Sequence, residues 1–384
     1  MKMNERPVIR PLRPLLALLM MLFSSGCVSM GPSQADRWFR GNTHTHTLRS
    51  DGDATPEVVA KWYHDRNYNF LIITDHNKFV DPREVKLPDG RRKDFILIPG
   101  EEITGNRTIH TTAMNIAKVA SWKYKDEDKS KIIQSHVDEA IKAGGAAILN
   151  HPNFRYAVSA EDILPVRRLH MFELFNGHPS VHNSGNHAHP STEAIWDHLL
   201  TAGMKIFAVA ADDAHHYKVI SPKKANPGRG WVMVRAAELE ADAITKAMLQ
   251  GDFYTSTGVF LEICKRGSNT YSVKVDAERT RKEVASLPSI SGKHVESTYE
   301  GFRIEFIGPK GIILNTINGD KGSFTIGQST PYVRAKVTFT RKHPKRHGFE
   351  EYYAWGQPVF ADARADTEAS GREEHNQTDA SDDL

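Results

Sequence analysis

The segment Gly41-Asn42-Thr43-His44-Thr45-His46-Thr47-Leu48-Arg49-Ser50-Asp51-Gly52 places two histidines one residue apart and sets an acidic side chain before a glycine. In extended backbone, side chains two positions apart point to the same face, so both imidazoles can reach one metal ion. A His-x-His pair on a surface strand is also common as a solvated edge. What recurs further along the chain therefore decides what this segment does.

Short apolar runs alternate with longer segments of helical period from Trp38 onward. This alternation is typical of β/α units around a mainly parallel sheet. Because the runs are almost entirely apolar, we expect them to be strands that are buried on both faces. They occupy residues 70–73, 95–98, 146–149, 171–175 and 206–210.

Four helices are predicted between these runs. Thr55 can cap the first helix, which would begin with Pro56 in its first turn. We interpret the apolar stripes of all four as faces that pack on the sheet rather than as a cofactor site. The other three helices are predicted from stripes followed by glycine, at residues 133–141, 194–199 and 243–248.

Beyond Gly258 the alternation stops, and the remainder has a different pattern. Amphipathic strands separated by turn residues predict a small antiparallel β appendage at residues 259–360, which follows an α/β region at residues 40–258. Residues 361–384 are acidic and almost free of apolar side chains, which predicts a disordered tail. The predicted strands of the appendage are residues 271–275, 302–307, 323–326 and 333–339.

The first 27 residues have the pattern of a signal peptide. Lys2, Arg10 and Arg13 precede an apolar run at residues 15–23, which is too short to span a bilayer. The run ends at Ser24-Ser25-Gly26-Cys27, which resembles the cleavage box of bacterial lipoproteins, and a plain signal peptide cut nearby is the alternative. We therefore expect an exported protein, either a periplasmic or cell-envelope lipoprotein or a secreted one, with residues 28–39 as a linker. With a lipid on Cys27, Cys264 would have no partner for a disulfide.

The composition indicates an ordinary globular protein, with 384 residues of which 39% are hydrophobic and 25% charged. A net charge of +3 is nearly balanced for this length, so we expect no nucleic-acid partner. The basic cluster at residues 341–347 lacks interleaved aromatic side chains, and we interpret it as a solvated turn between strands. The expected partner is a small-molecule substrate, and the only expected membrane contact is the lipid on Cys27.

Residues able to bind metal ions follow nearly every predicted strand of the α/β region. In a closed β/α barrel, the loops after the carboxyl ends of the strands converge on one site. Side chains that are remote in sequence would then become neighbours. These residues are His44 and His46 after the first extended run, and acidic or histidine side chains within residues 74–77, 100–103, 150–152 and 212–216.

Imidazole and carboxylate side chains are the ligands expected for zinc, manganese or iron. The set is larger than one ion can use, so we expect two or three divalent ions. Metals about 3.5–4 Å apart lower the pKa of a shared water and neutralise charge on a substrate, which is hydrolytic chemistry at neutral pH. The chain has no Gly-rich phosphate loop and no Gly-x-Ser-x-Gly elbow, so nucleotide-driven transfer and serine hydrolysis lack support.

Together these motifs resemble the PHP (polymerase and histidinol phosphatase) metallohydrolases over residues 40–258. The resemblance implies a distorted, TIM-like barrel of seven β/α units with a multinuclear metal site. Within the family, the chain is most similar to the branch named for carbaryl hydrolase (CehA/McbA). The family resemblance rests on His44-x-His46 with residues 50–52, and on residues 74–76, 100–102, 150–152 and 213–215. The similarity to the branch rests on residues 74–77, 99–104, 213–216, 228–231 and 353–360.

The resemblance also implies which side chains hold each ion. Asp51 stands where many members have histidine, which predicts a harder and weaker second site. Glu102 rather than its neighbour Glu101 is chosen by its spacing from Gly100. The implied ligands are His44, His46, Glu102 and Asp213 for one ion, Asp51, His76 and His215 for the second, and Glu102, His151 and His110 for the third.

Other polar side chains near these motifs have two interpretations each. Asp75, Asp212 and His216 either orient ligand imidazoles or make ordinary loop hydrogen bonds. Residues 176–189 form a polar segment that can build one wall or lid of the site, with His178 as a substrate-binding residue and His182, His187 and His189 as solvated loop side chains. Arg229 either clamps an anionic oxygen of the substrate or forms a structural salt bridge.

The leading hypothesis is a metal-dependent hydrolase in which metal-bound hydroxide attacks a phosphomonoester or phosphodiester. Asp213 would help to move the proton. One alternative keeps the site and changes the substrate to a carboxylic or carbamic ester or amide. Another alternative is a non-catalytic, metal-containing binding protein on the cell surface.

Overall fold

The computed structural model describes residues 37–87, 94–120, 128–267, 269–286, 293–297, 299–345 and 347–360. These residues belong to one compact unit, Asp36–Leu384. The predicted signal peptide with its lipidation site, most of the linker, and the acidic tail lie outside the described residues. Among the described residues, no helix is long and apolar enough to cross a membrane.

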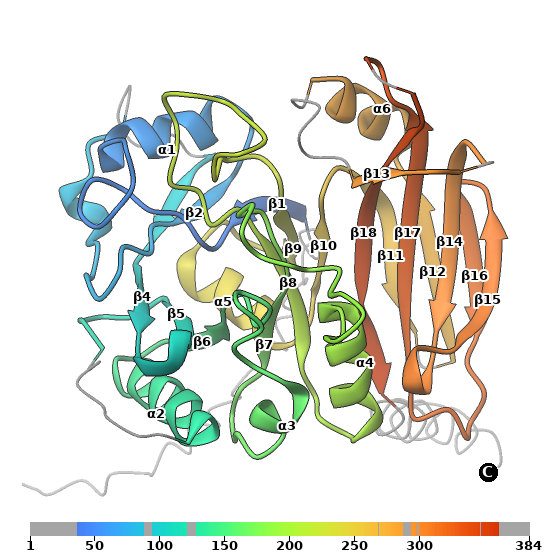
Figure 1. Ribbon diagram of the computed structural model, residues 1–384, viewed down its shortest axis with the longest axis horizontal. Helices are drawn as coiled ribbons and strands as arrows, with labels where there is room; N and C mark the ends of the chain where they lie inside the picture. Colours follow the sequence, from blue (N-terminus) through green and yellow to red (C-terminus); the bar gives the residue numbers. More distant parts are fainter. Residues whose placement is uncertain are drawn as a thin grey trace, which may run out of the picture. The chain divides into compact units, whose positions relative to one another are not determined.

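A ten-stranded sheet runs through the molecule (Figure 1). Its parallel part consists of β1, β2 and β3, and β9 pairs with β1 in the antiparallel direction. Antiparallel pairs then continue through β10 and β18 to β15. Its strands are β1 (Arg37–Asn42), β2 (Phe70–Ile72), β3 (Ile96–Ile98), β9 (Trp231–Ala236), β10 (Phe253–Ser256), β13 (Lys293–Val295), β14 (Gly301–Ile307), β15 (Ile313–Asn318), β17 (Tyr332–Lys342) and β18 (Phe349–Phe360).

Two smaller sheets accompany it. In the five-stranded sheet, β6, β7 and β8 are parallel, while β5 pairs in the antiparallel direction with both β4 and β6. The three-stranded sheet is antiparallel. Their strands are β4 (Gly100–Thr104), β5 (His110–Met114), β6 (Ala146–Leu149), β7 (Met171–Asn176) and β8 (Phe207–Ala211), and β11 (Leu261–Arg266), β12 (Thr270–Val275) and β16 (Lys321–Thr325).

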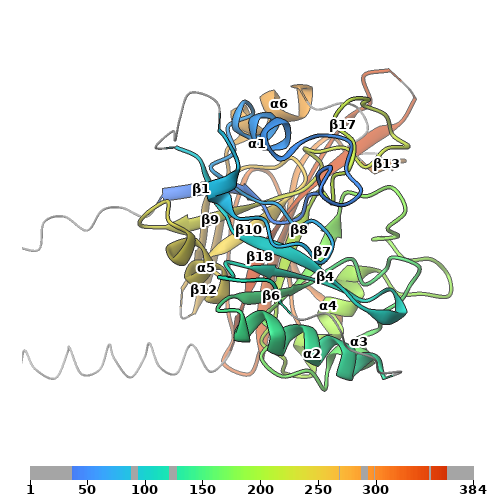
Figure 2. The same cartoon turned by 90° about the vertical axis from the view of Figure 1, so that its left-hand side faces the viewer.

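Helices cover the sheets where the apolar stripes predicted them. The Thr55 hydroxyl accepts from the Val58 N–H and caps α1, as predicted. In Figure 2, α2 lies beside β6, and α5 packs against β9. The helix α6 lies in the region predicted to be all β and was not predicted. The helices are α1 (Pro56–His64), α2 (Lys129–Lys142), α3 (Ala160–Ile163), α4 (Thr192–Thr201), α5 (Ala241–Leu249) and α6 (Ala277–Ser286), with 3-10 turns η1 (Pro82–Glu84), η2 (Asn106–Thr108) and η3 (Pro309–Gly311).

The α/β class is confirmed, but strand pairing among the described residues does not close into a barrel. Pro99 separates β3 from β4, and a proline has no N–H with which to continue a ladder. At the other end, the side chains of Thr255 and Gln357 bond to the backbone of Ala208 and take the place of a neighbouring strand. The predicted seven-unit barrel is therefore not one continuous ladder, and only isolated backbone bridges, among them Thr45–Ala214 and His76–Glu102, join the two sheets among the described residues.

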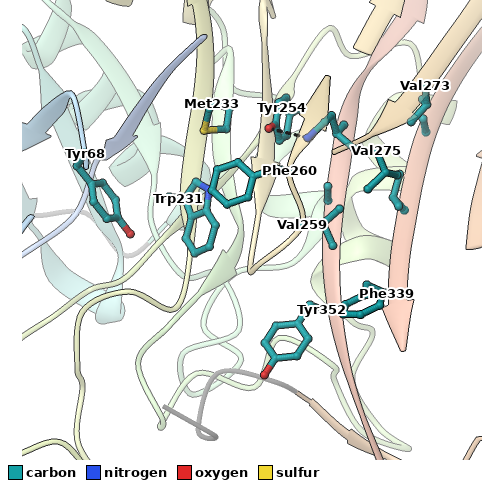
Figure 3. Packing of buried hydrophobic residues seen from close by; sticks show 14 of the residues in the cluster. Tyr68, Trp231, Met233, Tyr254, Val259, Phe260, Val273, Val275, Phe339 and Tyr352 are labelled. Carbon is teal, nitrogen blue, oxygen red and sulfur yellow. Dashed lines mark hydrogen bonds between the residues drawn. The ribbon is translucent and has the colours of Figure 1, made fainter. Parts of the chain in front are cut away.

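The C-terminal strands are antiparallel, as predicted, but they extend the main sheet rather than stand apart from it. β18 pairs with β10, so the sheet continues across the predicted boundary at Gly258. One buried hydrophobic cluster also spans both regions, from Tyr68 and Trp231 to Val273 and Tyr352 (Figure 3). The boundary itself stays a prediction.

Candidate metal centre

The two histidines of the opening segment lie just beyond β1 and are completely buried. The side chain of Asn42 accepts from the His44 N–H, and the His46 N–H donates to the Ala214 carbonyl, which fixes the extended backbone. The two Nε2 atoms are 3.1 Å apart. Both imidazoles therefore face the same point, as the spacing predicted.

The first predicted ligand set comes together around this pair. His44 Nε2 lies 3.3 Å from Glu102 Oε1 and 3.3 Å from Asp213 Oδ1. His46 Nε2 lies 3.2 Å from the same Asp213 oxygen. His44 and His46 follow β1, Asp213 follows β8 and Glu102 lies within β4, so both large sheets contribute to this set.

The second predicted set also comes together. Asp51 Oδ2 lies 3.3 Å from His215 Nε2 and 3.5 Å from His76 Nε2. His46 joins this set, since its Nδ1 atom is 3.4 Å from Asp51 Oδ1. The Asp51 side chain is 53% exposed, so this end of the centre is open to solvent.

The third set is arranged around Glu102. Its Oε1 atom lies 3.2 Å from His110 Nδ1 and 3.3 Å from His151 Nε2, and its Oε2 atom lies 2.8 Å from His76 Nδ1. Strand alternation turns the adjacent Glu101 to the other face, where it accepts from the Ala120 N–H. Glu102 is therefore the glutamate that faces the cluster.

All nine predicted ligands fall into four overlapping groups whose candidate ligand atoms lie within 4.8 Å of one another. Two of them, His151 (φ 25°) and Asp213 (φ 49°), have positive φ angles, which residues other than glycine rarely adopt. Such strain persists only where the surrounding structure holds it, and it is concentrated at functional sites. The nine residues are His44, His46, Asp51, His76, Glu102, His110, His151, Asp213 and His215.

The separations between these atoms fit ligands that share an ion. Ligand atoms about 2.1 Å from a tetrahedral zinc ion stand about 3.4 Å apart, close to the 3.2–3.3 Å separations in the first set. Hydrogen bonds account for few of these contacts, and the buried Glu102 Oε2 and His110 Nδ1 atoms have no hydrogen-bond partner among the described residues. Imidazole and carboxylate donors in this arrangement suit divalent zinc, manganese or iron.

The electrostatics keep the central carboxylates charged. Burial alone would raise the pKa of Glu102 and of Asp213, but neighbouring imidazoles, above all His44, hold both pKa values well below the ordinary range. Burial and the neighbouring His215 lower the pKa of His46 to about 4. At neutral pH the two carboxylates are anionic and His46 offers a lone pair, as metal binding requires.

No family model matches the sequence, and no curated protein matches it. Among solved structures, the chain is similar to a two-domain protein from Bacteroides vulgatus that contains a predicted PHP-like metal-dependent phosphoesterase. The identity is 14% over 83% of this chain and 95% of that chain, with a TM-score of 0.41. It is also similar to an amidohydrolase from Chromobacterium violaceum with bound sulfate and no metal, at 14% identity over 46% of this chain and 88% of that chain, with a TM-score of 0.31. The chemistry of this chain is therefore inferred from its own side chains.

Glu173 is a functional side chain that sequence reasoning missed. It is 1% exposed, and its Oε1 atom lies 2.7 Å from His44 Nδ1. Its Oε2 atom accepts from the His151 N–H and from Asn176 Nδ2, both at 2.8 Å. The Asn176 amide also donates to Asp213 Oδ2 at 3.2 Å. The sequence feature that could have identified Glu173 is a single carboxylate inside the otherwise apolar run at residues 171–175. A buried charge needs partners, so such a carboxylate indicates a polar site nearby.

Two further polar side chains contact ligands, the buried Asn150 and the half-buried Thr104. The Asn150 amide donates to Glu102 Oε1 at 2.8 Å, and the Thr104 hydroxyl lies 2.5 Å from His76 Nδ1. Neither residue was predicted to act this way. Their contacts fix the rotamers of ligands that would otherwise have several orientations.

The predicted supporting aspartates both bind loops rather than imidazoles. Asp75 accepts from the backbone N–H and the hydroxyl groups of Thr47 and Ser50, and it thereby holds the loop that carries Asp51. Asp212 accepts from the Tyr63 hydroxyl and from the backbone N–H groups of residues 228–230. Of the two interpretations, loop hydrogen bonding is the one that the structure shows.

Among the described residues, Arg229 forms no salt bridge to a carboxylate, which was one of the two interpretations of its role. Its terminal nitrogens donate to the carbonyl groups of Gly177, Ser221 and Lys224, and the side chain is 5% exposed. These bonds hold together the two loops that flank the site. A role for Arg229 in substrate binding stays a prediction.

The metal pocket is a cavity of about 160 Å³ in which most of the ligands and His178 meet. His178 accepts the Ser180 N–H at Nδ1, so its neutral form carries the proton on Nε2. His182 and His189 instead stack on the ring of Tyr156. The pocket is lined by Asp51, His76, Glu102, His110, His151, Phe154, His178, Asp213 and His215.

Proposed function

We propose that the protein is a metal-dependent hydrolase of the PHP type, related to the carbaryl hydrolase branch, that acts on phosphoesters. One observation carries the proposal: nine imidazole and carboxylate side chains from separate strands and loops converge in four overlapping groups of potential ligands. A purely structural ion pair would not need this many donors. Buried charges are normally paired one to one, whereas Glu102 alone faces five imidazoles.

Two or three divalent ions bound by these residues would lower the pKa of a coordinated water and neutralise charge that develops on the substrate. Asp213 places Oδ1 among the imidazoles and turns Oδ2 toward Asn176. As a buried carboxylate that is ionised at neutral pH, Asp213 can take up the proton of the attacking water. Asn176 holds it in the orientation that this transfer needs.

His178 faces the same pocket from the loop after β7. Burial lowers its pKa, so the imidazole is neutral at pH 7. Its Nδ1 atom is occupied by the Ser180 N–H, and its Nε2–H is thus the group that can donate to a substrate oxygen. We assign His178 to binding the phosphoryl or leaving-group oxygen.

One observation favours the alternative substrate class. No lysine or arginine is among the described residues that line the metal pocket. A dianionic phosphate would have to be neutralised by the ions and by imidazoles alone, whereas a neutral carboxylic or carbamic ester or amide needs less positive charge. This class is the second candidate.

The test is turnover of an aryl phosphate, a phosphodiester and a naphthyl carbamate by the protein loaded in turn with zinc, manganese or iron. We expect phosphoester turnover that His46→Ala abolishes and His187→Ala, on the exposed loop, leaves within about twofold. Carbamate turnover with no phosphoester turnover would establish the second candidate instead. Retained metals with no turnover of any substrate would support a binding protein.

A further inference from the structure

A second cavity of about 600 Å³ adjoins the metal pocket. His178 lines both cavities, and the second one lies between the loop after β7, the start of α4 and the strands β17 and β18. Its volume falls in the range of about 300–1,000 Å³ that is usual for small-molecule sites. A substrate whose reacting group sits among the metal ligands can therefore extend past His178 into this space.

Aromatic rings form one wall of the second cavity. Phe175 and Trp355 stack with their ring centroids 6.4 Å apart and their planes at 28°. Tyr353 follows at 5.2 Å from Trp355, and the ammonium group of Lys336 lies 4.9 Å from the Tyr353 ring. These side chains come from β7, β17 and β18, so the C-terminal strands take part in the cavity.

Charged groups of both signs accompany the rings. Lys336 Nζ lies 2.6 Å from Glu193 Oε2, and the Tyr353 hydroxyl donates to Glu351 Oε2 at 2.6 Å. Each carboxylate keeps further lone pairs that can accept from a ligand. The lining also contains Arg229 and Lys293, so it presents both donors and acceptors to a ligand.

A sugar ring matches this combination. Its C–H faces pack on aromatic rings, and its hydroxyl groups both donate to carboxylates and accept from ammonium groups. An aryl group would cover the rings but would leave the remaining lone pairs of Glu193 and Glu351 without donors, which carries a desolvation cost. An uncharged polyhydroxylated ring satisfies both parts of the wall.

We propose that the second cavity binds a glycosyl group, so that the substrate is a phosphoester of a sugar whose ester oxygen lies near His178. The identification of a sugar phosphoester as the substrate rests on the proposed function. Hydrolysis would add water across the P–O bond, giving a free sugar hydroxyl and inorganic phosphate. The binding of the sugar itself does not depend on hydrolysis.

Binding is tested with maltose, an uncharged disaccharide, titrated into the full-length protein and followed by calorimetry. We expect saturable binding that Lys336→Met weakens about tenfold, because one hydrogen bond from a charged group is lost. Lys274→Met is the matched control, since Lys274 pairs with Glu262 on a strand outside the cavity and should leave binding unchanged. Absence of maltose binding, or equal binding by both variants, would overturn the proposal.

Specificity is tested with glucose 6-phosphate, phenyl phosphate and methyl phosphate, which carry the same charge. We expect kcat/KM to be highest for glucose 6-phosphate, and Tyr353→Leu to lower its ratio to methyl phosphate about tenfold. A preference for phenyl phosphate that the same variant removes would make the cavity an aryl site and refute the glycosyl assignment. Maltose binding that is sensitive to Lys336→Met, without turnover of any ester, would sustain this inference while the proposed function failed.

Discussion

Replacing Glu173 by glutamine tests whether a buried carboxylate sets the chemistry of the metal centre. Its two oxygens accept three bonds in the structure, from His44 Nδ1, the His151 N–H and Asn176 Nδ2. In the neutral form that binds a metal, the His44 proton stays on Nδ1 and the Nε2 lone pair faces Glu102 and the other ligands. The carboxylate therefore selects the tautomer that can bind a metal.

A glutamine at this position has one acceptor oxygen and one NH2 group. If its oxygen stays with His151 and Asn176, the NH2 group faces His44 Nδ1, which must then give up its proton and carry it on Nε2. If the amide is reversed, its NH2 group meets two N–H donors. The first orientation leaves fewer donors unpaired, so we expect the glutamine to impose the wrong tautomer on His44.

The expected magnitude follows from these contacts. Loss of a partner that orients a ligand histidine usually weakens metal binding about 10–100-fold, which is about 1.4–2.8 kcal/mol. The metal-free protein also loses a buried, charge-assisted hydrogen bond, which costs about 1.5–3 kcal/mol of unfolding free energy. Both effects should appear in Glu173→Gln, because its carboxylate is 1% exposed and water cannot replace the bonds.

The assay is competition for zinc or manganese against a chelator of known affinity, together with urea unfolding of the metal-free protein. Glu350→Gln is the matched control, since Glu350 is also 1% exposed but pairs with Arg341 away from the metal pocket. The control should lose stability and keep its metal affinity. Folded Glu173→Gln protein with the affinity of the wild type would refute the reasoning.

Three further perturbations act on other parts of the structure. Gly52→Ala should weaken metal binding about tenfold in the same chelator competition. A Cβ atom at this position would lie 2.6 Å from the backbone oxygen of His46, so the loop that carries the ligands must move. Arg334→Met should cost about 3–5 kcal/mol in urea unfolding, because it leaves the buried Asp197 carboxylate without its two 2.7 Å bonds, and adding Asp197→Leu should recover most of the loss. Burial lowers the pKa of His136 to about 4, so the unfolded chain binds its proton first as the pH falls from about 6.5, and the wild type should lose up to about 3 kcal/mol between pH 6.5 and pH 4. His136→Met should remove that part of the pH dependence of unfolding, and an unchanged slope would contradict the assignment.

Much of the local structure could be predicted from the sequence, because its causes are local. Thr55 as the N-cap and Pro56 in the first turn predict the start of α1, and this signal does not depend on what the helix packs against. Gly144, Gly203 and Gly251 follow three helices with φ values of 98°, 88° and 73°, which side chains with a Cβ atom rarely adopt. The nine candidate ligands were predicted from the resemblance to the PHP family, which itself rests on imidazoles and carboxylates that follow apolar strands.

The long-range features could not be predicted, because pairs of residues distant in sequence decide them. Nothing local to Thr255 or Gln357 shows that their side chains will bond to the backbone of β8, about 50 and 150 residues away, and end the pairing there. The extension of the main sheet by the C-terminal strands depends on β10 meeting β18, which periodicity cannot reveal. Strand patterns identify strands, and they leave the choice of partner open.

Glu173 links a local sequence feature to a long-range contact between the two sheets. It lies on β7 of the five-stranded sheet, its Oε1 atom meets His44 beyond the end of β1 in the ten-stranded sheet, and its Oε2 atom meets the backbone of His151 beyond β6. The ladders of the two sheets are separate, and isolated backbone bridges between Thr45 and Ala214 and between His76 and Glu102 join them beside the ligands. The side-chain contacts of Glu173 add to this register. Because the first ligand set takes residues from both sheets, an ion bound there would hold the same junction that Glu173 holds. Metal binding and the docking of the two sheets should therefore be coupled. The ligand motifs in the sequence identify the residues that bind the metal, but they do not include Glu173, which holds the same junction.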